Sequence, residues 1–132
     1  MQSIPKPGDT VKVTDAILLC KDHGYLELAK RLSDAKDELP DEWTFDGCSH
    51  WFNTYKSHPV YEVCFFHDCA YLVGGSEAQR LEADYLLGLG LVRMTGSVDF
   101  SEITFAGVRI GGGGAWRKNF SWGYGKSSDN TE

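Results

Sequence analysis

Three ionisable side chains stand out because of their types and their spacing. His67 and Asp68 are adjacent in residues 64–71, which read CFFHDCAY, and Asp84 follows in the next predicted helix. Burying two ionisable groups in so apolar a segment costs several kcal/mol unless they are paired or coordinated. A carboxylate that binds one nitrogen of an imidazole orients the ring, and the other nitrogen is then free to take a proton from water. These residues indicate a hydrolase that activates water.

A metal site is expected beside this pair. Asp46 precedes Gly47 in a loop rich in aromatic residues. Asp68 points about 100° away from His67 around a helix, so its carboxylate can face a separate ligand. Two carboxylates together with loop carbonyls suit Ca²⁺, which accepts six to eight oxygen ligands in flexible geometry. Such an ion can polarise an ester carbonyl and stabilise the oxyanion that forms when water attacks.

Two helices are expected to position the pair. Residues 59–73 are apolar nearly all round and predict a buried helix. After Gly74 and Gly75, the segment from Ser76 to Gln79 has the pattern of a capping box, and it predicts a helix running to about residue 87 or 91. If the helices are antiparallel, His67 lies roughly 10 Å before the turn and Asp84 roughly 13 Å after it, so the two are nearly level.

The rest of the chain predicts a mainly α fold, a small helical domain with two central antiparallel helices that carry the His/Asp pair. Residues 1–13 predict an irregular or briefly extended lead-in, and further helices are expected at 15–22, 25–36 and 100–110. Residues 39–55 show no periodicity and predict a long loop, whose length favours a functional role. The apolar face of the helix after Ser76 is expected to consist of Leu81, Tyr85, Leu86 and Leu89. One domain spans 1–125, with a disordered tail at 126–132.

Composition narrows the partners and the location. The 132 residues are 42% hydrophobic and carry a net charge of −6, which is typical of one globular domain and argues against a nucleic-acid partner. There is no apolar signal region near the N-terminus and no run long enough to span a bilayer. The protein is therefore expected in the cytoplasm, or released or exported by a route that the sequence does not reveal.

Two motifs taken together resemble a known family. Residues 46–49 (DGCS) followed by 64–71 (CFFHDCAY) look like the secreted phospholipase A2 superfamily, and most like its bacterial and fungal branch. The resemblance covers roughly residues 43–87, about a third of the chain. It implies a calcium-dependent hydrolase that cleaves the sn-2 ester of glycerophospholipids at a membrane interface. Similar short His-Asp proteins are encoded in bacterial and phage genomes.

The resemblance also implies roles for single residues. His67 is the general base, and Asp84 is the carboxylate that orients it. The calcium ligands are Asp46, the carbonyl of Gly47 and Asp68.

Two structural features follow from the same resemblance. Tyr71 supports the pair through a hydrogen bond, and Cys48 and Cys64 form a disulfide. The other two cysteines, Cys20 and Cys69, are most simply small core residues.

Rival readings of the same residues remain open. A metal-dependent phosphohydrolase of the HD type needs further ligands near His67, for which His23, His50 and His58 are available. Zinc binding by Cys48, His50 and His58 is a second possibility, with irregular spacing. The strongest rival is not an enzyme: a catalytically inactive phospholipase-like scaffold that serves as a binding or structural protein, for example in a phage particle.

Overall fold

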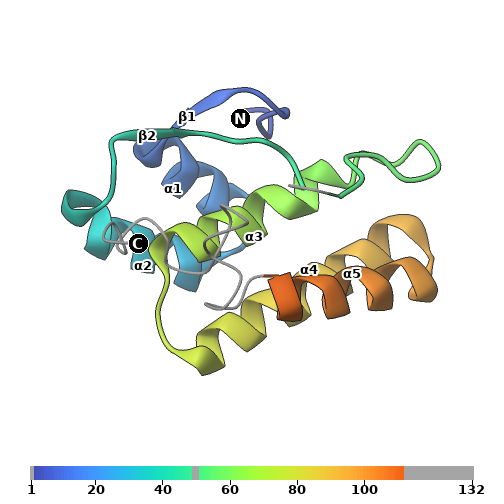
Figure 1. Cartoon of the computed structure of the whole chain (residues 1–132). Helices are drawn as coiled ribbons and strands as arrows, with labels where there is room; N and C mark the ends of the chain where they lie inside the picture. Colours follow the sequence, from blue (N-terminus) through green and yellow to red (C-terminus); the bar gives the residue numbers. More distant parts are fainter. Residues whose placement is uncertain (1, 49–50, 112–132) are drawn as a thin grey trace.

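The chain is mainly helical, as the sequence predicts. The computed structural model describes residues 2–48 and 51–111. The described part contains the helices α1 (Val13–Asp22), α2 (Leu26–Ala35), α3 (Tyr61–Val73), α4 (Glu77–Thr95) and α5 (Val98–Gly111), the short 3-10 helix η1 (Lys36–Glu38), and the strands β1 (Thr10–Lys12) and β2 (Glu42–Thr44) (Figure 1). None of these helices has both the length and the apolar character needed to cross a bilayer. The tail expected at 126–132 lies outside the described residues.

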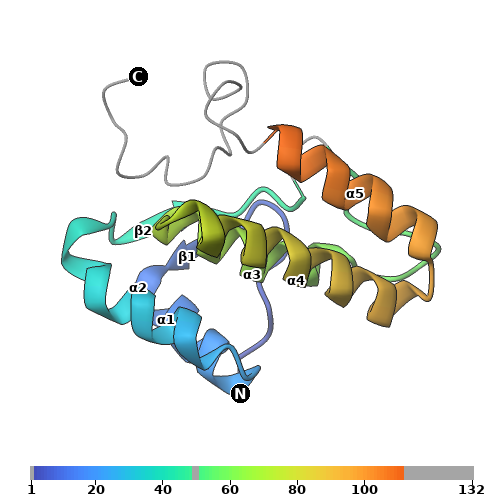
Figure 2. The ribbon, with the colours of Figure 1, turned by 90° about the horizontal axis from the view of Figure 1, so that it is seen from below.

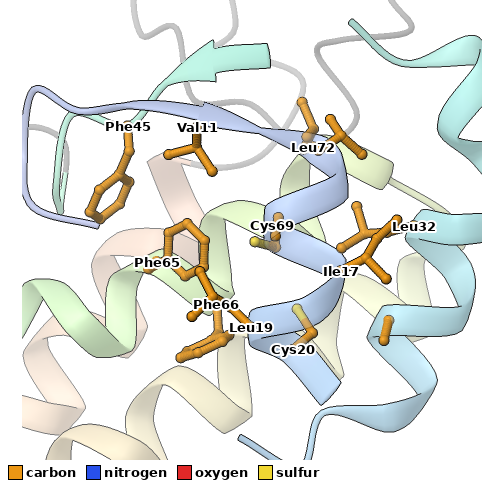
Figure 3. Close-up of a cluster of buried hydrophobic side chains, with 13 residues drawn as sticks. Val11, Ile17, Leu19, Cys20, Leu32, Phe45, Phe65, Phe66, Cys69 and Leu72 are labelled. Atoms are coloured by element: carbon orange, nitrogen blue, oxygen red, sulfur yellow. The ribbon is translucent and has the colours of Figure 1, made fainter. Parts of the chain in front are cut away.

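Helix α3 occupies the middle of the fold. Each helix packs against the next one in the chain, and Figures 1 and 2 show α1 and α2 to one side of α3 and α5 to the other, with α4 running back along α3. Because α3 is apolar nearly all round, it can bury side chains on both sides. The larger core cluster lies between α1, α2, α3 and the strands (Figure 3); it includes Val11, Ile17, Leu19, Cys20, Leu32, Phe45, Phe65, Phe66, Cys69 and Leu72.

The segment 39–55 is not wholly loop. Residues 42–44 form β2, which pairs antiparallel with β1 so that Val11 lies opposite Trp43. Val11 is buried, and Trp43 stacks on Phe65 of α3 with ring centroids 6.2 Å apart. Three residues are too few to produce a readable alternation, so packing on α3 rather than local pattern determines this strand.

The expected apolar face of α4 is wrong. Leu81, Tyr85 and Leu86 are exposed, and only Leu89 of the expected set is half-buried. The buried residues of α4 are instead Arg80, Ala83, Asp84, Leu87, Gly88 and Leu91. The helix is rotated so that Arg80 and Asp84 turn inward, because their charges are satisfied by partners on α3 and α5, described below.

Two glycines let α4 run to Thr95 in close contact with its neighbours. A Cβ on Gly90 would lie 2.7 Å from Cγ1 of Val63 on α3. At Gly88, the carbonyl accepts a hydrogen bond from Oγ of Ser101 on α5, at 2.6 Å. Both glycines therefore mark close approach of α4 to the neighbouring helices.

Candidate active site

A buried hydrogen bond joins His67 of α3 to Asp84 of α4. Nε2 of His67 lies 2.7 Å from Oδ1 of Asp84. The histidine is 8% exposed and the aspartate is fully buried. The structure therefore brings together the two residues that the spacing places at the same level, within one helical hairpin.

The turn between the helices sets this register. Gly74 and Gly75 have φ values of 71° and 137°, which L side chains rarely adopt. Oγ of Ser76 then accepts a hydrogen bond from the backbone N–H of Gln79, and Oε1 of Gln79 accepts one from the N–H of Ser76. This capping box starts α4 at a defined residue, so the position of Asp84 relative to His67 is fixed.

The carboxylate of Asp84 has partners on all three helices around it. Oδ1 accepts a hydrogen bond from Oη of Tyr71, at 2.7 Å, and contacts His67. Oδ2 accepts one from Nη1 of Arg109 on α5, at 2.8 Å, and Nε of Arg80 lies 3.9 Å away. Burial alone raises the pKa of Asp84, but hydrogen bonds from His67, Tyr71 and Arg109 outweigh it and hold that pKa below its ordinary value.

The ionised state of Asp84 determines the tautomer of His67. A carboxylate can only accept hydrogen bonds, so the proton that it shares with the imidazole belongs to Nε2 of His67. Nδ1 is then the nitrogen that can accept a proton. Tyr71, one turn further along α3, remains a hydroxyl donor, because burial and the charge of Asp84 raise its pKa far above the ordinary value.

His67 lines a cavity of about 310 Å³ between α2 and α4. Its apolar lining includes Tyr25, Leu28, Val63, Phe66, Ala70, Ala83 and Leu87. Leu26 and Leu86 also line it and are 66% and 40% exposed, which places them at its mouth. Charged and polar residues also line the cavity: Glu27, Arg31, Gln79 and Glu82. Its apolar part, beside the imidazole, has the lining that an apolar ligand segment needs.

Asp46 and Gly47, two of the three residues expected to bind metal, lie on a loop that two contacts hold against α3, the helix that carries the third, Asp68. The ring of Phe45 packs edge-on against Phe65, with centroids 5.4 Å apart, and Cys48 is bonded to Cys64. Asp46 is exposed and lies between these two contacts. Residues three and four apart share a face of a helix, so Phe65 and Cys64 both adjoin the partly buried Asp68 on α3.

The backbone at Gly47 lies close against the side chain of Asn53. Its φ is 77°, and a Cβ there would overlap the side chain of Asn53, whose Oδ1 accepts a hydrogen bond from the N–H of Cys48. The donor set of Asp46, Asp68 and the Gly47 carbonyl fits a hard cation. Across residues 2–48 and 51–111 no three or more His, Cys, Asp or Glu side chains are grouped for a metal. A cation here would therefore depend on carbonyl and water oxygens as well.

The cysteines are placed as expected. Cys48 and Cys64 form a disulfide, with Cα atoms 5.2 Å apart, and Cys20 and Cys69 are free and buried. Because Cys48 is oxidised, it offers no thiolate to a zinc ion.

The other histidines do not build a second site within the described residues. His23 follows α1 and packs on Phe66, with ring centroids 5.3 Å apart. His58 pairs with Tyr55 in an isolated bridge. His50 lies outside the described residues.

Sequence reasoning did not find Arg80, Arg109 and Glu77. Arg80 lies four residues before Asp84 on one helix, a spacing typical of ion pairs that could have identified it. Arg109 lies 25 residues after Asp84 on another helix, and no local pattern marks it. Both guanidinium groups donate to Oε2 of Glu77, at 3.0 Å from Arg80 and 2.9 Å from Arg109.

The chain matches no protein-family model, no curated protein and no solved structure.

Proposed function

We propose that this protein is a calcium-dependent hydrolase of phospholipase A2 type that cleaves the sn-2 ester of glycerophospholipids. The observation that carries the proposal is the buried His67–Asp84 hydrogen bond beside an apolar cavity. It supplies an oriented base next to a space suited to an acyl chain. The motif resemblance at residues 46–49 and 64–71 gives the reaction class.

The chemistry assigns one proton transfer to each step. Nδ1 of His67 takes a proton from a water molecule, and the oxygen of that water attacks the ester carbonyl carbon. Asp84 stabilises the resulting imidazolium through its bond to Nε2. When the tetrahedral intermediate collapses, the bond to the glycerol oxygen breaks and His67 returns the proton to that oxygen. The products are a free fatty acid and a lysophospholipid.

Calcium would be held by Asp46, Asp68 and the carbonyl of Gly47, and it supplies positive charge for the ester carbonyl and the phosphate. The Cys48–Cys64 disulfide supports this assignment, because it ties the Gly47 loop to the turn of α3 that precedes Asp68. A disulfide persists in an oxidising environment, so the bridge also favours the exported location over the cytoplasm.

The test is fatty-acid release from mixed micelles of phosphatidylcholine and detergent, with calcium and with a chelator. Wild type should release fatty acid only with calcium, and His67→Ala should release none. His23→Ala is the matched control. It removes an imidazole that packs on Phe66 and makes no contact with Asp84. Release that is the same with chelator, or that survives in His67→Ala, would contradict the assignment.

A second function is a calcium-binding scaffold without catalysis. One observation favours it: Asp84 is held by Tyr71 and Arg109 as well as by His67, so the buried carboxylate also serves to join three helices. A wild-type protein that releases no fatty acid, yet gains thermal stability with calcium and loses that gain in Asp68→Asn, would select the scaffold.

A further inference from the structure

We infer that Arg109 of α5 is a positioning residue for the His67–Asp84 pair, acting through a guanidinium fork between two carboxylates. Nη1 of Arg109 donates to Oδ2 of Asp84 at 2.8 Å, and Nη2 donates to Oε2 of Glu77 at 2.9 Å. This inference rests on the proposed hydrolase function and deepens it. It makes α5 part of the site, although the motifs that indicate the site end on α4.

The two oxygens of Asp84 divide its partners between two sides. Oδ1 faces α3, where it meets His67 and Tyr71. Oδ2 faces α5, where Arg109 is the close donor and Arg80 of α4 is 3.9 Å away. Because a carboxylate is planar and rigid, a donor that fixes Oδ2 also fixes the direction in which Oδ1 points. Arg109 therefore controls the angle at which Asp84 meets the imidazole.

The backbone that carries Arg109 is itself held by hydrogen bonds from Arg80. Nη2 of Arg80 donates to the backbone carbonyls of Val108 and Arg109, at 3.1 and 2.7 Å. These carbonyls lie in the last turn of α5, where the helix dipole favours a positive charge. Arg80 also donates from Nε to Oη of Tyr71, at 3.2 Å. One arginine thus anchors the backbone that carries the other.

Arginine suits this place better than lysine. Its planar group presents two donors in a fixed geometry, whereas the lysine amine is a single point of charge that cannot hold both carboxylates in the same way. The side chain of Arg109 is 26% exposed, so it borders water on one side and the buried Asp84 on the other. A site whose base is oriented through such a fork should lose rate when the fork is removed, because small misplacements of reacting groups are costly.

The experiment compares wild type, Arg109→Gln, Arg109→Lys and the control Arg93→Gln. Arg93 lies on α4, is exposed, and loses the same charge without touching the pair. One readout is hydrolysis of a short-chain phosphatidylcholine below its micelle concentration, with calcium. The second is the downfield proton resonance of the His67 Nε2–H group, identified by its loss in His67→Ala, which reports the hydrogen bond to Asp84 without any substrate.

In Arg109→Gln we expect kcat to fall about 10- to 100-fold with KM unchanged, and the resonance to shift or broaden. Arg109→Lys should restore part of the rate and part of the resonance. Arg93→Gln should match wild type in both readouts. Wild-type kcat and resonance in Arg109→Gln would overturn the inference. If Arg109→Gln does not fold, the Lys variant decides: intermediate values support the fork, and wild-type values refute it. If wild type shows no hydrolysis, the proposed function fails, and the resonance alone decides whether Arg109 positions the pair.

Discussion

Replacing Asp84 by asparagine removes one buried charge and keeps the shape of the side chain. The amide oxygen can still accept from Tyr71 and His67, but the amide NH₂ group then faces the guanidinium of Arg109, donor against donor. If the amide is flipped, its NH₂ group faces Tyr71 and His67, and these contacts are kept only if both groups become acceptors, with the His67 proton moved to Nδ1. A charge-assisted hydrogen bond contributes about 1.5–3 kcal/mol, and breaking a buried pair costs about 3–5 kcal/mol.

The expected loss lies in the upper part of the first range and just below the second. Arg109 is 26% exposed, so water solvates it in part once its partner is gone. We therefore expect Asp84→Asn to lower the free energy of unfolding by about 2–3 kcal/mol.

Urea unfolding followed by circular dichroism measures this loss as a lower midpoint with an unchanged m-value. The matched control is Asp22→Asn, an exposed aspartate in the last turn of α1, where removing a negative charge should cost nothing. A loss under about 1 kcal/mol in Asp84→Asn would show that the carboxylate charge does not hold the three helices together.

Three further outcomes follow from the same contacts. Because the pKa of Asp84 is lowered on folding, its stabilisation is present above the unfolded value and is lost as the pH falls through the folded one. The stability gap between wild type and Asp84→Asn should therefore narrow below about pH 4, whereas a constant gap down to about pH 2 would contradict the lowered pKa. Replacing Cys48 and Cys64 together by serine removes a cross-link between residues 16 apart, so the free energy of unfolding should fall by about 3 kcal/mol. Thermal melts would show this as a lower Tm, and an unchanged Tm would be inconsistent with an oxidised bridge. Gly90→Ala should destabilise α4 by about 1–3 kcal/mol, because its Cβ would meet a valine of α3. Gly107→Ala on α5, where a Cβ meets nothing, should stabilise by about 0.5–1 kcal/mol, and equal effects of the two changes would refute the close approach of α3 and α4.

The helical hairpin could be predicted from the sequence because its signals are local. The apolar run of α3, the two glycines after it and the capping box at Ser76 each indicate one boundary. Once those boundaries are set, the rise per residue brings His67 and Asp84 to one level. The structure adds that the two side chains face each other, with a 2.7 Å hydrogen bond between them.

What could not be predicted depends on contacts between distant segments. The rotation of α4 follows from the burial of Arg80 and Asp84, and a hydrophobic pattern assigns such charged residues to the surface. Arg109 reaches Asp84 only because α5 folds back on α4. Strand β2 forms because it pairs with β1, which places Val11 opposite Trp43, about thirty residues away in the chain.

The contacts between neighbouring helices have a consequence for the kinetics of folding. Since each helix packs on the next one in the chain, most tertiary contacts need only short loops to close, and such topologies fold quickly. His67 and Asp84 are 17 residues apart, so their hydrogen bond can form when the α3–α4 hairpin closes. The β1–β2 ribbon joins residues 10–12 to 42–44 and requires a longer loop. In a φ-value series, substitutions in the α3–α4 hairpin should therefore slow folding, while those in the ribbon should mainly speed unfolding.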